Sequence, residues 1–523
     1  MPRIAPRHAL ATTLVLVLGF LPFFILDRWY IGGLILVSGL TIAVLAWLWT
    51  TPRLALSRQT FWIDWFVLVF LVIAIFSAIF SHSRIESLDA LLYLMSAGIV
   101  FIVARSCADE KTRIGLAMAI ILIGVVTTSF ALWYALQLPE LSIRIYGVFR
   151  NPDGFGPSLI IPLFFNLGLI ALCMRRWQRI LLTATAITLA GALLMASSVS
   201  SLVGMLLAGL IGAFVLRIRP RGSVILGTVS ALILALILMF FFRQALLNEQ
   251  STTTSVTGFV STAGAVSSWH QRLSFVQASS DMARAHPLVG VGLGLWADFF
   301  PQFQHSILEH TRTPHGFIFL LLGELGWPGA IAFAALFLTT CLALARAARR
   351  ESASALTKFG AVGIVAAGIA AMIDIPWGYP VNMMLFWICA GCFLAPVTTT
   401  VTKALPQKVF RGMILMVALL ILGYGAARFT TSYLVDQVNS AAKRHDAIDV
   451  IATASIARRM FPSPPQITYM ASFFNLSQMV SDRNVAQSWL EQSLRLNPYQ
   501  PAAYHMLGKI VLDKKDHRQA ESL

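Results

Sequence analysis

The stretch "RTPHGFIFLLLGELGWPGAIAF", residues 312–333, contains two ionisable side chains in a hydrophobic setting. His315 stands at the start of the apolar segment and Glu324 lies further inside it. Ionisable groups are costly in a hydrocarbon core, so both residues are candidates for function. The pKa range of histidine suits a general base at a membrane surface. Glu324 lies about 180° around an ideal helix from His315, which favours a structural role for Glu324, bonded to loop backbone or to a buried arginine.

Arginine side chains supply further chemistry, because the planar guanidinium fork suits phosphate oxygens. Arg272 lies in "SSWHQRLSFVQASSDMARAHP", which predicts an interfacial helix ended by Pro287. Arg272 and His315 are therefore the candidate catalytic residues, Arg272 to bind an anion and His315 to act as a base or to hydrogen-bond that anion. Asp374 follows an apolar segment, where it could hold an arginine or an acceptor, or simply cap the helix. The predicted substrate-binding residues are Arg144, Arg150, Arg312 and Asp374.

No metal site and no cofactor is predicted from the sequence. Cys389 and Cys392 form a C-x-x-C inside an apolar segment without a partnering histidine or carboxylate, so helix packing is the better interpretation. Gly290 and Gly292 belong to "HPLVGVGLGLW", where no strand–turn–helix unit supports nucleotide binding. We predict structural roles for Gly290, Gly292, Gly326 and Glu324.

Composition shows what kind of elements must position these residues. The chain has 523 residues, of which 57% are hydrophobic and 12% charged, whereas soluble domains average about 25% charged. Lipid admits only helices or closed barrels. The predicted fold class is all-α, a polytopic helical membrane protein with about 13 transmembrane helices of about 20 residues each. The expected spans are 9–26, 30–50, 61–81, 87–104, 114–136, 156–174, 180–197, 199–216, 223–242, 315–345, 356–374, 379–397 and 410–427.

Positive charge predicts the orientation of these helices. With a cytoplasmic N-terminus, Lys and Arg concentrate in the inward loops, whereas the short outward loops contain only Arg28, Arg84, Arg144 and Arg150. This is the positive-inside pattern, and it sends residues 137–155, 243–314 and the tail to the outer face. The net charge of +16 then reflects topology and contact with membrane lipids, not nucleic-acid binding.

We expect four regions along the chain. Residues 1–242 contain the N-terminal transmembrane helices, the first retained as an anchor. Residues 243–314 form a large outer loop with the interfacial helix. Residues 315–427 contain the C-terminal transmembrane helices, in which Gly326 and Pro328 break the long segment 315–345. Residues 428–523 form a tail in which similar positions recur after about 34 residues, a spacing typical of tetratricopeptide repeats. A generic helical hairpin is the alternative for the tail.

Several stretches together are similar to the O-antigen ligase/polymerase superfamily. "RLSFVQASSDMARAHPLVGVGLGLW", followed by "PHGFIFLLLGELGWPG", resembles the family's Arg-bearing helix, His-Pro-Leu-x-Gly-x-Gly and His-led helix with Glu-Leu-Gly. "YGVFRNPDGFGPSLIIPL" resembles its Gly-x-Phe-x-Asn-Pro-Asn segment, with Asp153 in place of the last asparagine. Val199 stands where the family often has an arginine before a span. The resemblance covers about residues 145–395.

The resemblance implies an activity as well as a fold. Members of this family move a glycan from a polyprenyl-diphosphate carrier to a hydroxyl or amine acceptor at the outer face of the bacterial cytoplasmic (inner) membrane. They include lipopolysaccharide ligases, repeat-unit polymerases and protein O-oligosaccharyltransferases. The expected partners are therefore the lipid-linked glycan donor and a glycan, lipid or protein acceptor, without a metal ion. A periplasmic tail could also bind a protein partner.

Two functions of other classes fit the same helices and outer arginines. A transporter of lipid-linked oligosaccharide should have ionisable residues deep in several spans or repeated halves, and mid-span charge is scarce in this sequence. A non-catalytic envelope scaffold that recruits proteins through its tail is favoured by Val199, because it replaces an arginine of the family motif.

Overall fold

The structure is a computed structural model. It describes residues 61–107, 110–137, 145–149, 151–173, 175–214, 262–305, 311, 313–394, 436–458, 482–496 and 501–513, with scattered positions between 419 and 434. The described residues form helices and no strands, as expected for a polytopic helical membrane protein. The chain divides into two compact units, and the second contains the tail helices.

Six segments in the described part are long and apolar enough to cross a membrane. They are Trp62–Ile79, Glu110–Gln137, Pro152–Leu172, Arg176–Ala196, Phe317–Arg349 and Ala355–Ile373. The total of about 13 spans stays a prediction, because the expected spans 9–26, 30–50 and 223–242, and most of 410–427, lie outside the described residues.

The helices before residue 400 follow the expected hydrophobic segments closely. They are α3 (Phe61–Ile79), α4 (Arg84–Cys107), α5 (Glu110–Gln137), α6 (Pro152–Ser158), α7 (Ile160–Leu172), α8 (Arg176–Ala196), α9 (Val199–Phe214), α11 (Thr262–Ala285), α12 (Trp296–Phe303), α13 (Phe317–Arg349), α14 (Ala355–Ile373) and α15 (Pro380–Leu394). Two short 3-10 turns, η2 (Gly147–Phe149) and η4 (Pro376–Gly378), lie between them.

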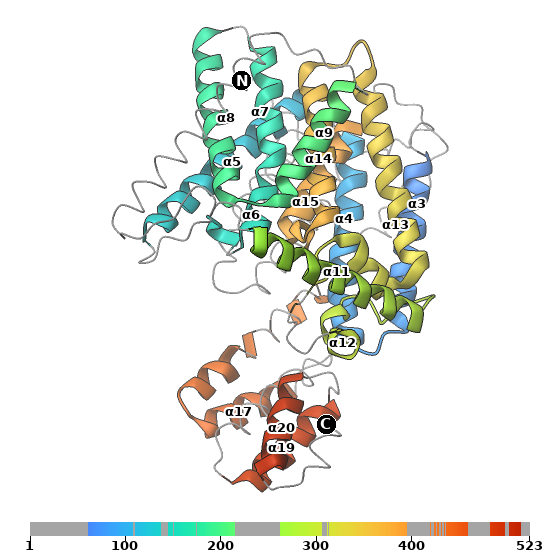
Figure 1. Cartoon of the computed structure of the whole chain (residues 1–523), viewed down its shortest axis with the longest axis vertical. Coiled ribbons are helices and arrows are strands. Elements are labelled where there is room, and N and C mark those ends of the chain that lie inside the picture. Colours follow the sequence, from blue (N-terminus) through green and yellow to red (C-terminus); the bar gives the residue numbers. More distant parts are fainter. Residues whose placement is uncertain are drawn as a thin grey trace. The chain divides into compact units, whose positions relative to one another are not determined.

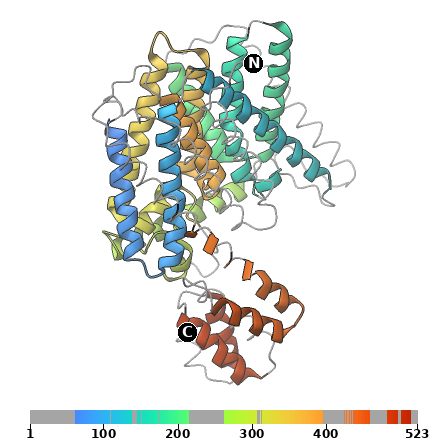
Figure 2. The ribbon, with the colours of Figure 1, turned by 180° about the vertical axis from the view of Figure 1, so that it is seen from behind.

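Helix α14 lies at the centre of the bundle, where α7, α9, α13 and α15 pack against it (Figure 1). Small residues allow these close approaches, as is common between membrane helices. A Cβ atom added to Gly204 of α9 would lie 2.6 Å from the carbonyl oxygen of Ala366, and one added to Gly168 of α7 would lie 2.9 Å from Cα of Leu356. Helices α3 and α4 pack side by side next to α13 and α15 (Figure 2). Helix α14 is therefore held by helices on several sides.

Helix α13 contains the break that the sequence predicts at Gly326. This glycine has φ 67° and ψ −167°, which is not a helical conformation. The loop after α11 fills the gap, because Trp327 N donates to the carbonyl oxygen of Pro287 at 3.1 Å. A Cβ atom on Gly326 would lie 2.5 Å from that same oxygen, so only glycine fits.

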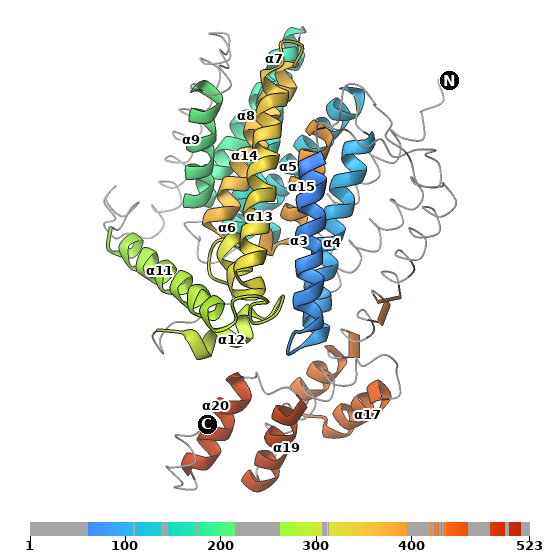
Figure 3. The ribbon, with the colours of Figure 1, turned by 90° about the vertical axis from the view of Figure 1, so that its right-hand side faces the viewer.

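Helix α11 packs against α13 and runs obliquely to the bundle helices (Figure 3). Its buried face contains Phe275, Ala278, Met282 and Ala283, at the spacing of one helical stripe. The position of α11 at the membrane interface stays a prediction.

The tail unit contains α17 (Ala447–Arg458), α19 (Arg483–Leu496) and α20 (Pro501–Asp513). Helices α19 and α20 pack through Leu490, Ala503, Leu507 and Val511. Residues 459–481 lie outside the described residues. The tetratricopeptide-like character of the tail therefore stays a prediction.

Candidate functional site

Arg272 is placed by the buried face of α11. It precedes Phe275 by one helical turn, so both side chains lie on the face of α11 that packs inward. The same face is fixed further along by Ser279, whose hydroxyl accepts a hydrogen bond from Nε1 of the buried Trp296 at 2.9 Å. The Arg272 side chain is 19% exposed. It is therefore held by packing and still open to a ligand.

His315 is placed by the turn that begins α13. Its backbone has φ 52°, which is uncommon for a residue other than glycine. The next residue, Gly316, has φ 123°, and a Cβ atom there would lie 2.9 Å from the carbonyl oxygen of Met372. The turn is thus pressed against the end of α14. The His315 ring stacks on Phe275 with ring centroids 5.9 Å apart.

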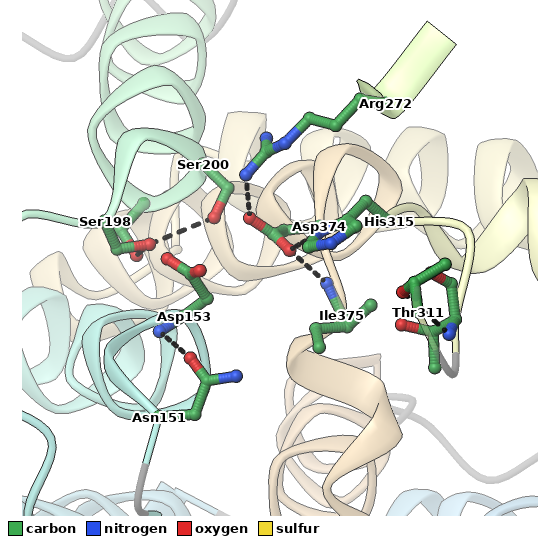
Figure 4. Close-up of polar contacts among 11 residues, drawn as sticks. Asn151, Asp153, Ser198, Ser200, Arg272, Thr311, His315, Asp374 and Ile375 are labelled. Carbon is green, nitrogen blue, oxygen red and sulfur yellow. Dashed lines mark hydrogen bonds and ion pairs between the residues drawn. The ribbon is translucent and has the colours of Figure 1, made fainter. Parts of the chain in front are cut away.

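Asp374, at the C-terminal end of α14, joins these two residues (Figure 4). Its side chain is fully buried. Oδ2 accepts from Nη2 of Arg272 at 2.9 Å, and Oδ1 accepts from Nδ1 of His315 at 2.8 Å. Oδ1 also accepts from the backbone N–H of Ile375 at 2.9 Å. The three predicted residues therefore form one connected group.

The electrostatics of this group keep Asp374 ionised. Burial raises the pKa of its carboxyl group, but the hydrogen bond from His315 and the charge of Arg272 together outweigh burial and lower the pKa below its usual value. An ionised carboxylate only accepts hydrogen bonds, so Nδ1 of His315 carries a proton. The other ring nitrogen, Nε2, is then the atom that can take a proton from a substrate.

Arg272 retains hydrogen-bonding capacity beyond Asp374. A guanidinium group has five N–H donors, and among the described residues Asp374 is the hydrogen-bond partner of Arg272. The remaining donors can bind phosphate oxygens. The group therefore combines an anion-binding fork with an oriented histidine.

A second set of polar side chains lies beside Asp374, on the segment before α6. Asn151 caps α6, with Oδ1 accepting from the backbone N–H of Asp153 at 2.8 Å. The hydroxyl group of Tyr379 hydrogen-bonds Asn151. Burial, then the negative charges of Asp153 and Asp374, raise the pKa of Tyr379 to about 12, despite the opposing effect of that hydrogen bond. Tyr379 therefore stays protonated at neutral pH.

Serine hydroxyl groups from the junction of α8 and α9 complete the surroundings (Figure 4). Ser198, Ser200 and Ser201 are fully buried, and the hydroxyl of Ser198 lies 3.1 Å from each of the other two. Val199 stands between them in the sequence, but its side chain is 62% exposed. Val199 therefore points away from this buried serine cluster.

Glu324 lies in a different environment from His315. It is buried, and its Oε1 accepts from the backbone N–H of Trp296 at 3.4 Å. Its carbonyl oxygen accepts from Gly292 N at 3.2 Å, and a Cβ atom on Gly290 would lie 2.2 Å from its carbonyl carbon. These contacts bind the glycine-rich loop to the break in α13. The structural roles of Glu324, Gly290, Gly292 and Gly326 stay a prediction.

Three predicted residues, Arg144, Arg150 and Arg312, lie outside the described residues. Sequence reasoning did not single out Asn151 or Tyr379. The Asn-Pro-Asp stretch that contains Asn151 was a usable signal, because asparagine before proline marks a turn and a helix start. In the part of the chain that the structure describes, no group of three or more His, Cys, Asp or Glu side chains could hold a metal ion.

Comparison with known proteins identifies the region that contains Arg272 and His315. Residues 184–334 match the O-antigen ligase family model. No curated protein matches the chain. The match supports a glycosyl-transferring enzyme of the O-antigen ligase or polymerase type in a multi-pass membrane protein. Such an enzyme takes a lipid-linked glycan donor and an acceptor. Asp374 lies beyond the matched residues, so its place in the site comes from the structure.

Proposed function

We propose that the protein is an O-antigen ligase-like transferase. It moves a glycan from a polyprenyl-diphosphate carrier to an acceptor at the outer face of the bacterial inner membrane. The observation that supports this most is the contact of Arg272 and His315 with one buried carboxylate, Asp374. An anion-binding fork beside an oriented base is what displacement of a diphosphate by a hydroxyl group requires.

The reaction is a single displacement. Nε2 of His315 takes the proton of the acceptor hydroxyl as its oxygen attacks the anomeric carbon of the donor. The bond from that carbon to the diphosphate oxygen breaks, and the electron pair leaves with the diphosphate. Arg272 stabilises the growing negative charge of the leaving group. Asp374 fixes the ring of His315 and stabilises the imidazolium that forms, as in other Asp–His pairs.

The predicted topology completes this proposal. With a cytoplasmic N-terminus and a periplasmic tail, the site faces the side on which the diphosphate-linked glycan is presented. Arg144, Arg150 and Arg312 are further candidates to bind the diphosphate. Because fixed arginines can supply the positive charge, we propose that transfer is independent of metal ions. Addition of a chelator should leave the rate unchanged, and a loss of transfer that added Mg²⁺ restores would contradict this.

The surface-glycan profile of a deletion strain tests the proposal and identifies the acceptor. A ligase predicts loss of long-chain lipopolysaccharide with accumulation of the lipid-linked precursor. Chains with a single repeat would indicate a polymerase, and an unmodified protein with normal glycans would indicate a protein O-oligosaccharyltransferase. No change in any glycan would contradict the enzyme and leave the scaffold, whereas precursor trapped on the cytoplasmic side would indicate a transporter.

Variants of the site test the residue roles. Arg272→Ala and His315→Ala should each lower transfer by about 10² to 10³, the usual effect of losing one positioned electrostatic group. Transfer is measured with the purified full chain in lipid and normalised to the amount of protein. Wild-type rates in both variants would contradict the assignment of the site.

A further inference from the structure

We propose that Asn151, Asp153 and Tyr379 form a subsite that binds a sugar residue of the acceptor. This inference rests on the proposed transfer reaction and concerns side chains to which that reaction assigns no role. The acceptor would be a neutral, hydroxyl-rich glycan at the point of attachment. A phosphorylated acceptor group would not suit the subsite.

The three side chains are close to the reacting group. Oδ1 of Asn151 accepts from the backbone N–H of Asp153 at 2.8 Å, and the ring of Tyr379 packs over Gly154, the residue after Asp153. Asp153 lies beside Asp374 in Figure 4. The Asp374 carboxylate in turn contacts His315 at 2.8 Å. In Figure 4, Arg272 and the segment with Asn151 and Asp153 lie on different sides of the Asp374 carboxylate. A ligand bound by Asn151, Asp153 and Tyr379 would therefore lie next to the Asp374 carboxylate, which holds the ring of His315.

The chemistry of the three side chains suits a sugar rather than a phosphate. A carboxylate, a carboxamide and a phenol can accept and donate hydrogen bonds to neighbouring sugar hydroxyls. Asp153 adds a negative charge on this side, which opposes binding of a diphosphate. All three residues are partly exposed, so a ligand can reach them. Arg272 is positively charged, which suits the anionic diphosphate of the donor. The Asn151–Asp153 segment carries a negative charge, which suits an uncharged acceptor sugar better than a phosphate.

The subsite is also built rigidly. The ring of Tyr379 occupies the space above Gly154, where a Cβ atom would lie 2.5 Å from Cε2 of the ring. Phe149 packs edge-on against the same ring, with centroids 5.4 Å apart. Nδ2 of Asn382, on α15, donates to the carbonyl oxygen of Gly154 at 2.9 Å. Preorganised polar groups of this kind bind a ligand without a further ordering cost.

The direction of the reaction assigns this subsite to the acceptor. In a single displacement the nucleophile and the leaving group lie on opposite faces of the reacting sugar. If Arg272 binds the departing diphosphate, the acceptor must approach from the other side. The segment with Asn151 and Asp153 lies away from Arg272, beside the Asp374 carboxylate that holds the base (Figure 4).

Steady-state kinetics test the subsite with the full chain in lipid. The donor is the polyprenyl-diphosphate-linked glycan extracted from the deletion strain, and the acceptor is the membrane fraction of a strain unable to make that donor. Asp153→Ala and Tyr379→Phe should each raise the KM for the acceptor about 10-fold, as expected for one lost hydrogen bond. The KM for the donor and inhibition by farnesyl diphosphate should stay unchanged. Arg272→Ala should weaken that inhibition.

Two further variants sharpen the result. Asp153→Asn should recover most of the acceptor KM, because an amide also hydrogen-bonds hydroxyl groups; no recovery would contradict a neutral sugar ligand. Tyr134→Phe, at a tyrosine of α5 that packs on Tyr146, should change nothing. An unchanged acceptor KM, or an equal rise in the donor KM, overturns the subsite while the transferase stands. Absence of transfer by the wild-type chain would overturn both.

Discussion

Asp374→Asn is the most informative single substitution, because asparagine keeps the shape of the side chain and removes its charge. The backbone N–H of Ile375 and Nδ1 of His315 both donate to Oδ1, so the amide oxygen of asparagine should take that position. The amide NH₂ group then faces Nη2 of Arg272, where two donors oppose each other across a separation that is 2.9 Å in the wild type. The substitution therefore breaks the ion pair and leaves the histidine contact without charge.

The size of the effect follows from these two contacts. A hydrogen bond to a charged group contributes about 1.5–3 kcal/mol, and both contacts of Asp374 change in the variant. A combined loss of about 3–5 kcal/mol in the transition state lowers the rate by about 10² to 10⁴. The upper end matches the contribution of the aspartate to Ser-His-Asp catalysis, about 10⁴. We expect transfer by Asp374→Asn to fall within this range.

Asp281→Asn is the matched control. Asp281 also joins an arginine and a histidine, with Oδ1 2.7 Å from Nη1 of Arg284 and Oδ2 3.1 Å from Nε2 of His305. This group is exposed, so its contacts should contribute little. Transfer is measured at equal protein amounts, together with thermal unfolding in detergent. A rate for Asp374→Asn within threefold of the wild type, or an equal loss in Asp281→Asn, would refute the reasoning.

Three further predictions concern the same region. Because the pKa of Asp374 is lower in the folded protein than its usual value of 3.8, the ionised carboxylate stabilises the fold above that value, and this stability is lost as the pH falls through the folded pKa. The difference in Tm between wild type and Asp374→Asn should therefore stay constant from about pH 5 to 8 and shrink below about pH 4. Arg272→Lys should recover less than about a tenth of the activity, because an ammonium group does not reproduce the bidentate fork; near-wild-type transfer would contradict that geometry. Gly290→Ala should sharply reduce the yield of folded protein, since its Cβ atom would lie 2.2 Å from the carbonyl carbon of Glu324, whereas Gly209→Ala, with nothing within 4 Å, should express normally.

The sequence predicts the helices well because hydrophobic length and glycine–proline breaks act locally. The expected break at Gly326 is present, and the helices begin and end within a few residues of the expected spans. Arg272, His315 and Asp374 could each be selected as single residues, because ionisable groups stand out in an apolar chain. The arrangement of the three around one carboxylate could not be predicted.

The reason lies in the nature of a membrane bundle. A face that packs on another helix and a face that meets lipid are both apolar, so hydropathy does not reveal which helices are neighbours. Asp374 contacts Arg272 and His315, which are 102 and 59 positions away in the sequence. These residues come together because α11 and α14 both pack against α13. Tyr379 was missed for a related reason, because an aromatic residue at the start of a span is typical of any membrane interface.

The order of the three residues along the chain has a consequence for biosynthesis. The ribosome completes Arg272 first, then His315, and Asp374 last, 102 residues after the arginine. Until α14 has crossed the bilayer, the guanidinium and imidazole groups lack the carboxylate that aligns them. A nascent chain that has not yet inserted α14 therefore lacks the complete group. Under the proposed function, such a chain should transfer glycan no faster than Asp374→Asn.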